Sequence, residues 1–88
     1  MACTLRRNIG SPISAHTVDL GPRGMRVRTP RPLCPDETVV FDIADLDMRV
    51  NGEARVLRAE RANVYALRFE RLPEPMARRL HALAISKR

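Results

Sequence analysis

The sequence is poor in aromatic residues, histidines and cysteines, and each shortage argues against a class of protein. It contains no Trp, one Tyr and two Phe, so it lacks the stacking surface with which proteins bind single-stranded nucleic acids. Cys3 and Cys34 are too few for a disulfide framework, and with only two histidines besides they form no metal-binding pattern. We therefore interpret both cysteines as small buried hydrophobic residues and expect neither a metal nor a cofactor.

Long apolar runs are also missing. No segment approaches the roughly 20 apolar residues that a membrane helix needs, and the N-terminal sequence MACTLRRN lacks the apolar stretch of a signal peptide. We therefore expect no membrane span and a cytoplasmic location.

The chain offers little for catalysis. Its 88 residues predict a single domain, residues 1–88, with too small a core for an elaborate catalytic fold. His16 and His81 stand alone, and we interpret both as surface residues, since no nucleophile or acid is spaced to work with them. The sequence therefore predicts a binding module and not an enzyme.

Positive charge is what the sequence has in excess. Lys and Arg number 16 against 10 acids, a formal net charge of +6. Every one of these cations except Lys87 is an arginine. Arginine suits bidentate contacts with phosphate, so a phosphate-bearing partner is worth testing. Nucleic acid is the less favoured partner, because Phe41, Tyr65 and Phe69 all fall on predicted core faces.

Alternating apolar and polar residues predict a series of short strands. The stretch 51–52 (Asn-Gly) is either a hairpin turn or a bulge within one long strand, and we favour the bulge. In the last strand Tyr65, Leu67 and Phe69 are expected to face inward, and Ala66 and Arg68 outward. The predicted strands are residues 2–7, 12–20, 25–29, 37–43, 48–56 and 64–70.

The C-terminal part of the sequence predicts a helix over about residues 74–86. Proline and an acid are typical of a first helical turn, and Met76, Leu80 and Leu83 recur at helical spacing. The proline-rich residues 30–35 predict a loop. A mainly β protein follows, either a small antiparallel barrel or a sandwich, with the helix packed against it.

The turn at residues 19–24 carries the most specific chemistry. Asp19 can accept hydrogen bonds from the Watson–Crick edge of a guanine or from an arginine, and Gly21 and Gly24 allow a flat or phosphorylated ligand to approach the backbone. The alternative is a Gly-Pro hairpin in which Asp19 caps its own turn.

The string Asp19-Leu-Gly21-Pro-Arg-Gly24-Met-Arg-Val resembles the signature of the PilZ family, which is Asp or Asn, any residue, Ser, two of any kind, then Gly, before a strand. The similarity continues through Thr-Val-Val-Phe-Asp-Ile, Gly-Glu-Ala-Arg-Val, Tyr-Ala-Leu-Arg-Phe and the terminal helix. It implies a six-stranded antiparallel β-barrel with a C-terminal helix, its strands within residues 2–71. It also implies a bacterial receptor for the second messenger cyclic di-GMP.

The sequence departs from the family pattern at two points. Gly21 replaces the motif serine, and no Arg-x-x-x-Arg pair is present, since Gly10 follows Arg6 and Ser11 follows Arg7 at that spacing. In typical spacing that pair would fall before Met1, so it is either truncated away or missing.

The expected ligand-binding residues are accordingly Asp19, Gly21, Arg23 and Gly24, with Arg6 and Arg7 as substitutes for the missing pair. For Arg6 and Arg7 the alternative is a role as ordinary exposed strand residues. The leading hypothesis is a cyclic di-GMP receptor module. The alternative is a degenerate PilZ domain that binds no nucleotide and acts as a protein-interaction adaptor.

Overall fold

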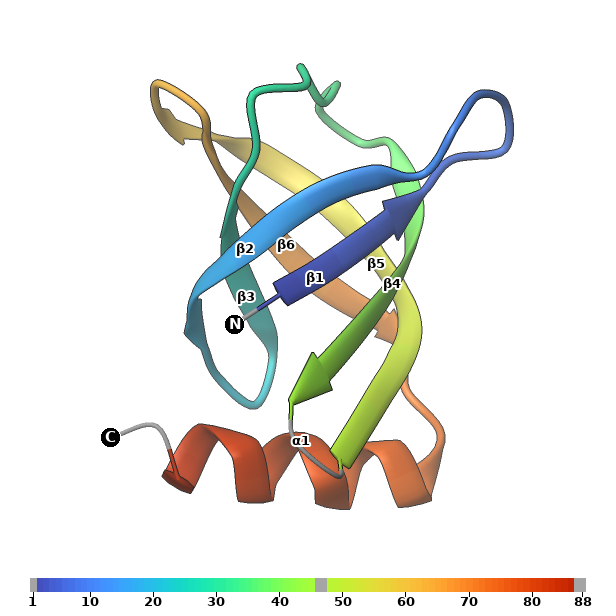
Figure 1. Cartoon of the computed structure of the whole chain (residues 1–88), viewed down its shortest axis with the longest axis vertical. Helices are drawn as coiled ribbons and strands as arrows, with labels where there is room; N and C mark the ends of the chain where they lie inside the picture. The colour runs from blue at the N-terminus through green and yellow to red at the C-terminus, as the bar shows by residue number, and fades with distance from the viewer. Residues whose placement is uncertain (1, 46–47, 87–88) are drawn as a thin grey trace.

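Six strands and one helix make up most of the computed structural model, which describes residues 2–45 and 48–86. The strands close into an antiparallel barrel in the order β1-β2-β3-β6-β5-β4, and Figure 1 shows α1 lying across its lower end. The predicted mainly β fold, a six-stranded barrel with a C-terminal helix, is confirmed. The elements are β1 (Ala2–Arg6), β2 (Ile13–Leu20), β3 (Gly24–Arg28), β4 (Thr38–Asp45), β5 (Met48–Arg61), β6 (Val64–Arg71) and α1 (Glu74–Ser86).

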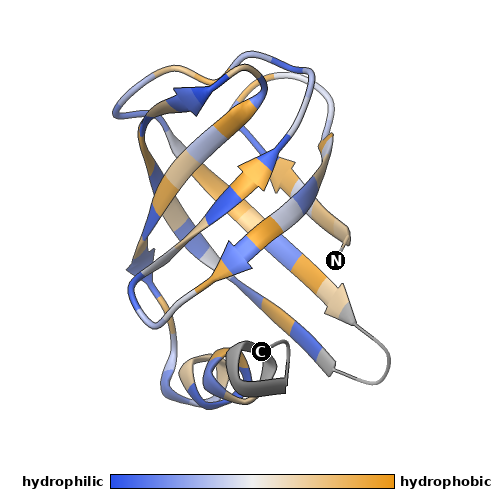
Figure 2. Cartoon of the chain, turned by 90° about the vertical axis from the view of Figure 1, so that its left-hand side faces the viewer, coloured by the Kyte–Doolittle hydropathy of each residue, from blue (hydrophilic) through white to orange (hydrophobic). Residues whose placement is uncertain are grey.

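Alternation along the strands builds the core, because successive side chains of a strand point to opposite faces. Figure 2 shows this as orange and blue bands that follow one another along the strands. At the seam of the barrel Leu5 on β1 lies opposite both Ile13 on β2 and Phe41 on β4. The buried cluster consists of Cys3, Leu5, Ile13, Ala15, Met25, Val27, Leu33, Val39, Phe41, Ile43, Val50, Ala54, Val56, Leu67 and Leu80.

Strand β5 passes through Asn51 and Gly52 without a turn. Its pairing with β4 runs unbroken from Thr38 opposite Arg55 to Ala44 opposite Arg49, so the hairpin-turn alternative is wrong. The irregularity lies on the other edge of β5, where the pairing with β6 shifts between Glu53 and Ala54. This shift bends a 14-residue strand around the barrel.

Two expectations about burial are wrong in part. Cys3 is buried, and burial raises the pKa of its thiol to about 11, but Cys34 is exposed because the proline-rich loop runs over the surface. Ala66 lies on the outer face, as expected, opposite the outward residues Arg26 and Arg58. It is nevertheless only 9 % exposed. Its small side chain lies between two long ones, whose aliphatic stems can cover it.

Helix α1 packs against β5 and β2. Leu80 is buried and Met76 packs against the core cluster, while the Arg79 guanidinium donates a hydrogen bond to the carbonyl oxygen of Arg49 (3.1 Å). Through these contacts the helix covers the end of the barrel at which the β2–β3 turn lies (Figure 1).

Among residues 2–45 and 48–86, no helix has the length and apolar character needed to cross a membrane.

Strands β3 and β6 come unusually close at Gly24, which lies opposite Arg68. A Cβ atom at Gly24 would overlap the carbonyl oxygen of Leu67 and lie 3.2 Å from the Cα of Arg68. Both neighbours are backbone atoms that the strand pairing holds in place. Gly24 is therefore required by the packing of the barrel, whatever else it does.

We expect Gly24→Ala to lower the free energy of unfolding by about 1–3 kcal/mol, because the new methyl group forces β3 away from β6. Gly21→Ala is the matched control, since a Cβ there meets only the carbonyl oxygen of Gly24 at 3.8 Å and should change stability by less than about 1 kcal/mol. Urea unfolding of both variants measures the difference. Equal stabilities for the two would contradict the steric argument.

Candidate functional site

The turn between β2 and β3 is tied down by two backbone hydrogen bonds. The amide of Gly21 donates to the carbonyl oxygen of Gly24 (2.9 Å), and the amide of Phe69 donates to that of Arg23 (2.9 Å). The first bond closes the turn, and the second fastens it to β6. Pro22 and Arg23 are exposed at its tip. The predicted site residues Asp19, Gly21, Arg23 and Gly24 thus lie together at the β2–β3 turn and the ends of the strands that it joins.

Asp19 faces Arg26 across the hairpin. The pairing of β2 with β3 shifts between Thr17 and Asp19, and this bulge places Asp19 opposite Arg26. The guanidinium of Arg26 donates to the Asp19 carboxylate from Nε (2.8 Å) and from Nη2. Of the two alternatives for Asp19, a partner across the hairpin is therefore found in place of a cap on its own turn.

This contact lowers the pKa of the Asp19 carboxyl group, through the hydrogen bond and then the charge of Arg26, and it raises the pKa of Arg26. A depressed carboxyl pKa means that the pair stabilises the fold above the pKa of the unfolded chain. This stabilisation is lost as the pH falls through the pKa of the folded state. Because both side chains are about half exposed, solvent keeps the contribution small.

Two further charged residues extend the pair along the outer face of the sheet. Glu60 lies 3.7 Å from Nη1 of Arg26 and 2.8 Å from Nε of Arg58. Together with Asp19 they line a hollow of about 480 Å³ that also contains Gly21, Gly24 and Ala66. Two carboxylates and two guanidinium groups balance its formal charge.

Sequence reasoning missed Arg58 and Glu60. They lie on β5, and they reach this hollow only because β6 pairs with β3 on one edge and with β5 on the other. Outward alternation in β3 could have suggested Arg26, since it places that side chain on the same face as its partner across the hairpin. No local signal relates β5 to the turn.

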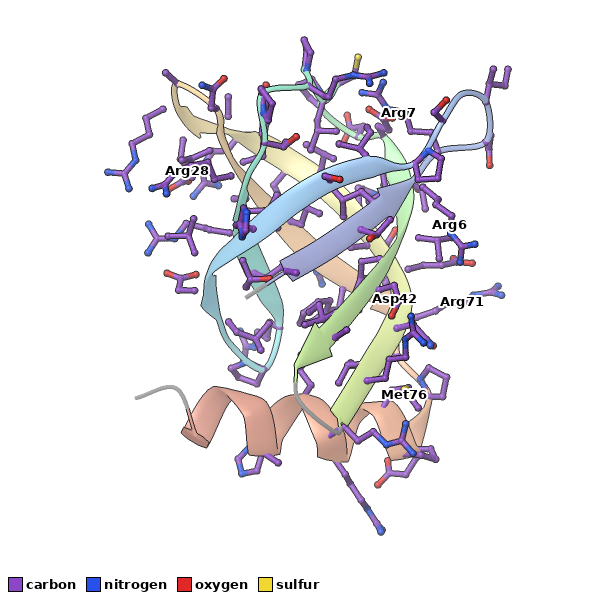
Figure 3. All side chains as sticks on the ribbon, in the orientation of Figure 1. Arg6, Arg7, Arg28, Asp42, Arg71 and Met76 are labelled. Carbon is purple, nitrogen blue, oxygen red and sulfur yellow. The ribbon has the colours of Figure 1, made fainter. Side chains whose placement is uncertain are left out.

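Arg6 and Arg7 lie at the other end of the barrel. Strand β1 pairs with β2 from Ala2 opposite His16 to Leu5 opposite Ile13, so Arg6 is about 20 Å from Asp19 at about 3.3 Å per residue. Figure 3 shows both arginines at the upper right, and Figure 1 shows the β2–β3 turn at the lower left. The structure does not bring Arg6 and Arg7 together with residues 19–24.

Arg7 has a structural partner at that end. Its guanidinium forms an ion pair with Glu37 and donates to the carbonyl oxygen of Pro32. The same carboxylate accepts a hydrogen bond from the amide of Cys34 (2.9 Å). Arg7 therefore holds the loop before β4 in place.

The histidines and acids suggest no other chemistry in the part of the chain that the structure describes. His16 on β2 and His81 on α1 are exposed. Among residues 2–45 and 48–86, no three His, Cys, Asp or Glu side chains gather where they could hold a metal ion.

Comparison with known proteins gives one family. The family model described as the PilZ domain matches residues 1–86, nearly the whole chain. No curated protein matches the chain.

We expect Arg26→Gln to raise the pKa of Asp19 toward the value of an isolated carboxyl group, because the substitution removes the guanidinium hydrogen bonds to the carboxylate and then the positive charge that stabilises it. An NMR pH titration that follows the side-chain carboxyl carbon measures it. Arg49→Gln removes an arginine that pairs with Asp42 (3.2 Å) and should leave Asp19 unaffected. An Asp19 pKa that stays low in Arg26→Gln would mean that another group holds it down.

Proposed function

The chain belongs to the PilZ domain family, and from this membership we propose that it is a regulatory module that binds cyclic di-GMP at the β2–β3 turn. The observation that carries the proposal is the geometry of residues 19–24. The carboxylate of Asp19 and the guanidinium of Arg26 lie side by side in one hollow next to an exposed turn. The predicted bacterial origin, cytoplasmic location and lack of enzymatic activity remain part of this proposal.

An aspartate beside an arginine suits a guanine base. A carboxylate can accept hydrogen bonds from the N–H groups of guanine, and an arginine can donate two to its O6 and N7 atoms. Asp19 and Arg26 satisfy each other in the free protein. Since an exposed ion pair contributes only about 0–1 kcal/mol, a base that bonds to both groups can replace it at little cost.

The glycines and Arg23 complete the proposed site. Gly21 places no side chain beside Asp19, and Gly24 carries none where β3 approaches β6. Arg23 contributes positive charge for the phosphates of the ligand. Arg6 and Arg7 are not part of this proposal, because they lie at the opposite end of β1 and Arg7 is engaged with Glu37.

Two observations favour the second candidate, a protein-interaction adaptor that binds no nucleotide. Arg26 already donates hydrogen bonds to the Asp19 carboxylate, so this carboxylate needs no ligand to satisfy it. Gly21 also lacks the hydroxyl group of the motif serine. A titration with the nucleotide separates the two candidates.

Isothermal titration of the protein with cyclic di-GMP should give saturable heat, and Asp19→Ala should weaken binding by about 10-fold or more, because hydrogen bonds to a charged group are lost. Asp42→Ala is the matched control, since it removes an ion-paired carboxylate from β4 and should leave the affinity unchanged. The absence of heat at tens of micromolar ligand would refute the receptor proposal and favour the adaptor. Equal effects of the two substitutions would mean that the binding site does not include Asp19.

Gly21→Ser should strengthen cyclic di-GMP binding by about fivefold, the effect of one added neutral hydrogen bond. The space for the side chain exists, because the nearest atom to a Cβ at this position lies 3.8 Å away. Gly21→Ala provides the control for bulk without the hydroxyl group. If serine and alanine change the affinity alike, the hydroxyl group makes no contact with the ligand.

A further inference from the structure

A second hollow, of about 780 Å³, lies beside the same turn. It adjoins the hollow that contains Asp19, because Gly24 and Leu67 line both. It is formed by the tip of the turn, by β6 and by the segment that leads to α1. Its lining residues are Pro22, Arg23, Gly24, Leu57, Leu67, Arg68, Phe69, Glu70 and Leu72.

The charge of this hollow differs from that of its neighbour. Arg23 and Arg68 form no ion pair with any residue that the structure describes. Glu70 also lines the hollow, but its carboxylate lies 2.7 Å from a guanidinium nitrogen of Arg55, which neutralises it. Two unpaired guanidinium groups therefore give this hollow a net positive charge, whereas the hollow beside Asp19 is balanced.

The backbone holds the two arginines close to each other. The carbonyl oxygen of Arg23 accepts the hydrogen bond from Phe69, the residue that follows Arg68 (2.9 Å). Arg68 in turn lies opposite Gly24, the residue that follows Arg23. Both side chains start from backbone that is fixed, so only their ends have to adjust to an anion.

An apolar surface lies beside these charges. Leu57 is 42 % exposed, although it is a large hydrophobic residue, and the partly buried Phe69 and Leu72 line the same hollow. Apolar side chains next to two guanidinium groups suit a ligand that combines anionic groups with a flat ring or a sugar face. A nucleotide has this composition.

We propose that Arg68, together with Arg23, binds the phosphodiester groups of a cyclic dinucleotide whose guanine base occupies the hollow beside Asp19. This inference rests on the proposed function and deepens it. Each phosphodiester is an anion, and planar guanidinium groups bind such oxygens in pairs. The neutral base then meets the balanced hollow, and the phosphates meet the positive one.

The outer face of the sheet supplies a matched control. Arg28 is an exposed arginine at the other end of β3, and like Arg68 it forms no ion pair with a described residue. It lies four residues from Gly24, about 13 Å along the strand, and Figure 3 shows it at the upper left. Removing either charge changes the net charge of the protein equally, so only local contacts distinguish them.

Isothermal titration with cyclic di-GMP tests the proposal on wild-type protein and on Arg68→Gln, Arg68→Lys, Arg23→Gln and Arg28→Gln. We expect Arg68→Gln and Arg23→Gln to weaken binding by about 10-fold or more and Arg28→Gln by less than about threefold. Arg68→Lys should fall in between, because it keeps the charge and loses the planar fork. Thermal unfolding of each variant verifies the fold, which these exposed positions should not disturb.

The outcomes separate the two proposals. If the wild-type protein binds and Arg68→Gln binds equally well, or if Arg28→Gln costs as much, the phosphate contact is wrong while the receptor function stands. If the wild-type protein does not bind cyclic di-GMP, the receptor function fails and this inference fails with it.

Discussion

The site depends on the close backbone contact between β3 and β6 at Gly24. Any side chain at Gly24 would collide with the carbonyl group of Leu67. The carbonyl oxygen of the preceding residue, Arg23, accepts a hydrogen bond from the backbone amide of Phe69. These contacts hold the β2–β3 turn against β6, so the turn cannot extend freely into solvent. Two hollows result, one on each side of the contact, and both are lined by Gly24. The glycine of this motif is therefore required by the packing of the barrel itself.

Local pairing of charges, and not the net charge of +6, determines where an anion could bind. On the outer face of the sheet Asp19, Glu60 and Glu70 each engage an arginine on a neighbouring strand or the same strand. Their pairing leaves Arg23 and Arg68 without a partner among the described residues, beside the turn. A positively charged hollow therefore adjoins a neutral one within a few residues, which a count of charges over the whole sequence could not reveal.

Strand alternation predicted the strands and a small antiparallel barrel or sandwich, because it depends only on neighbouring residues and on burial of one face. The choice of a six-stranded barrel came from the resemblance to the PilZ family. The same local pattern could not decide whether residues 51–52 form a turn, since that depends on the pairing of β5 with β4. It also could not foresee that Ala66 would be buried on the outer face between long side chains. The motif pointed to Asp19. Arg58 lines the same hollow and Arg68 the adjoining one only through the pairings of β6, which no spacing in the sequence records.

Two ion pairs of this barrel show why position decides what an arginine can do. The side chains of Arg7 and Glu37 are 27 % and 19 % exposed, and both make further hydrogen bonds that hold the loop before β4. A ligand that displaced Arg7 would break this arrangement. Arg26 and Asp19 are 44 % and 49 % exposed, and exposed pairs are weak. Their pairing therefore keeps both groups oriented while contributing little to the stability of the fold, so it is the pair of the two that costs less to break.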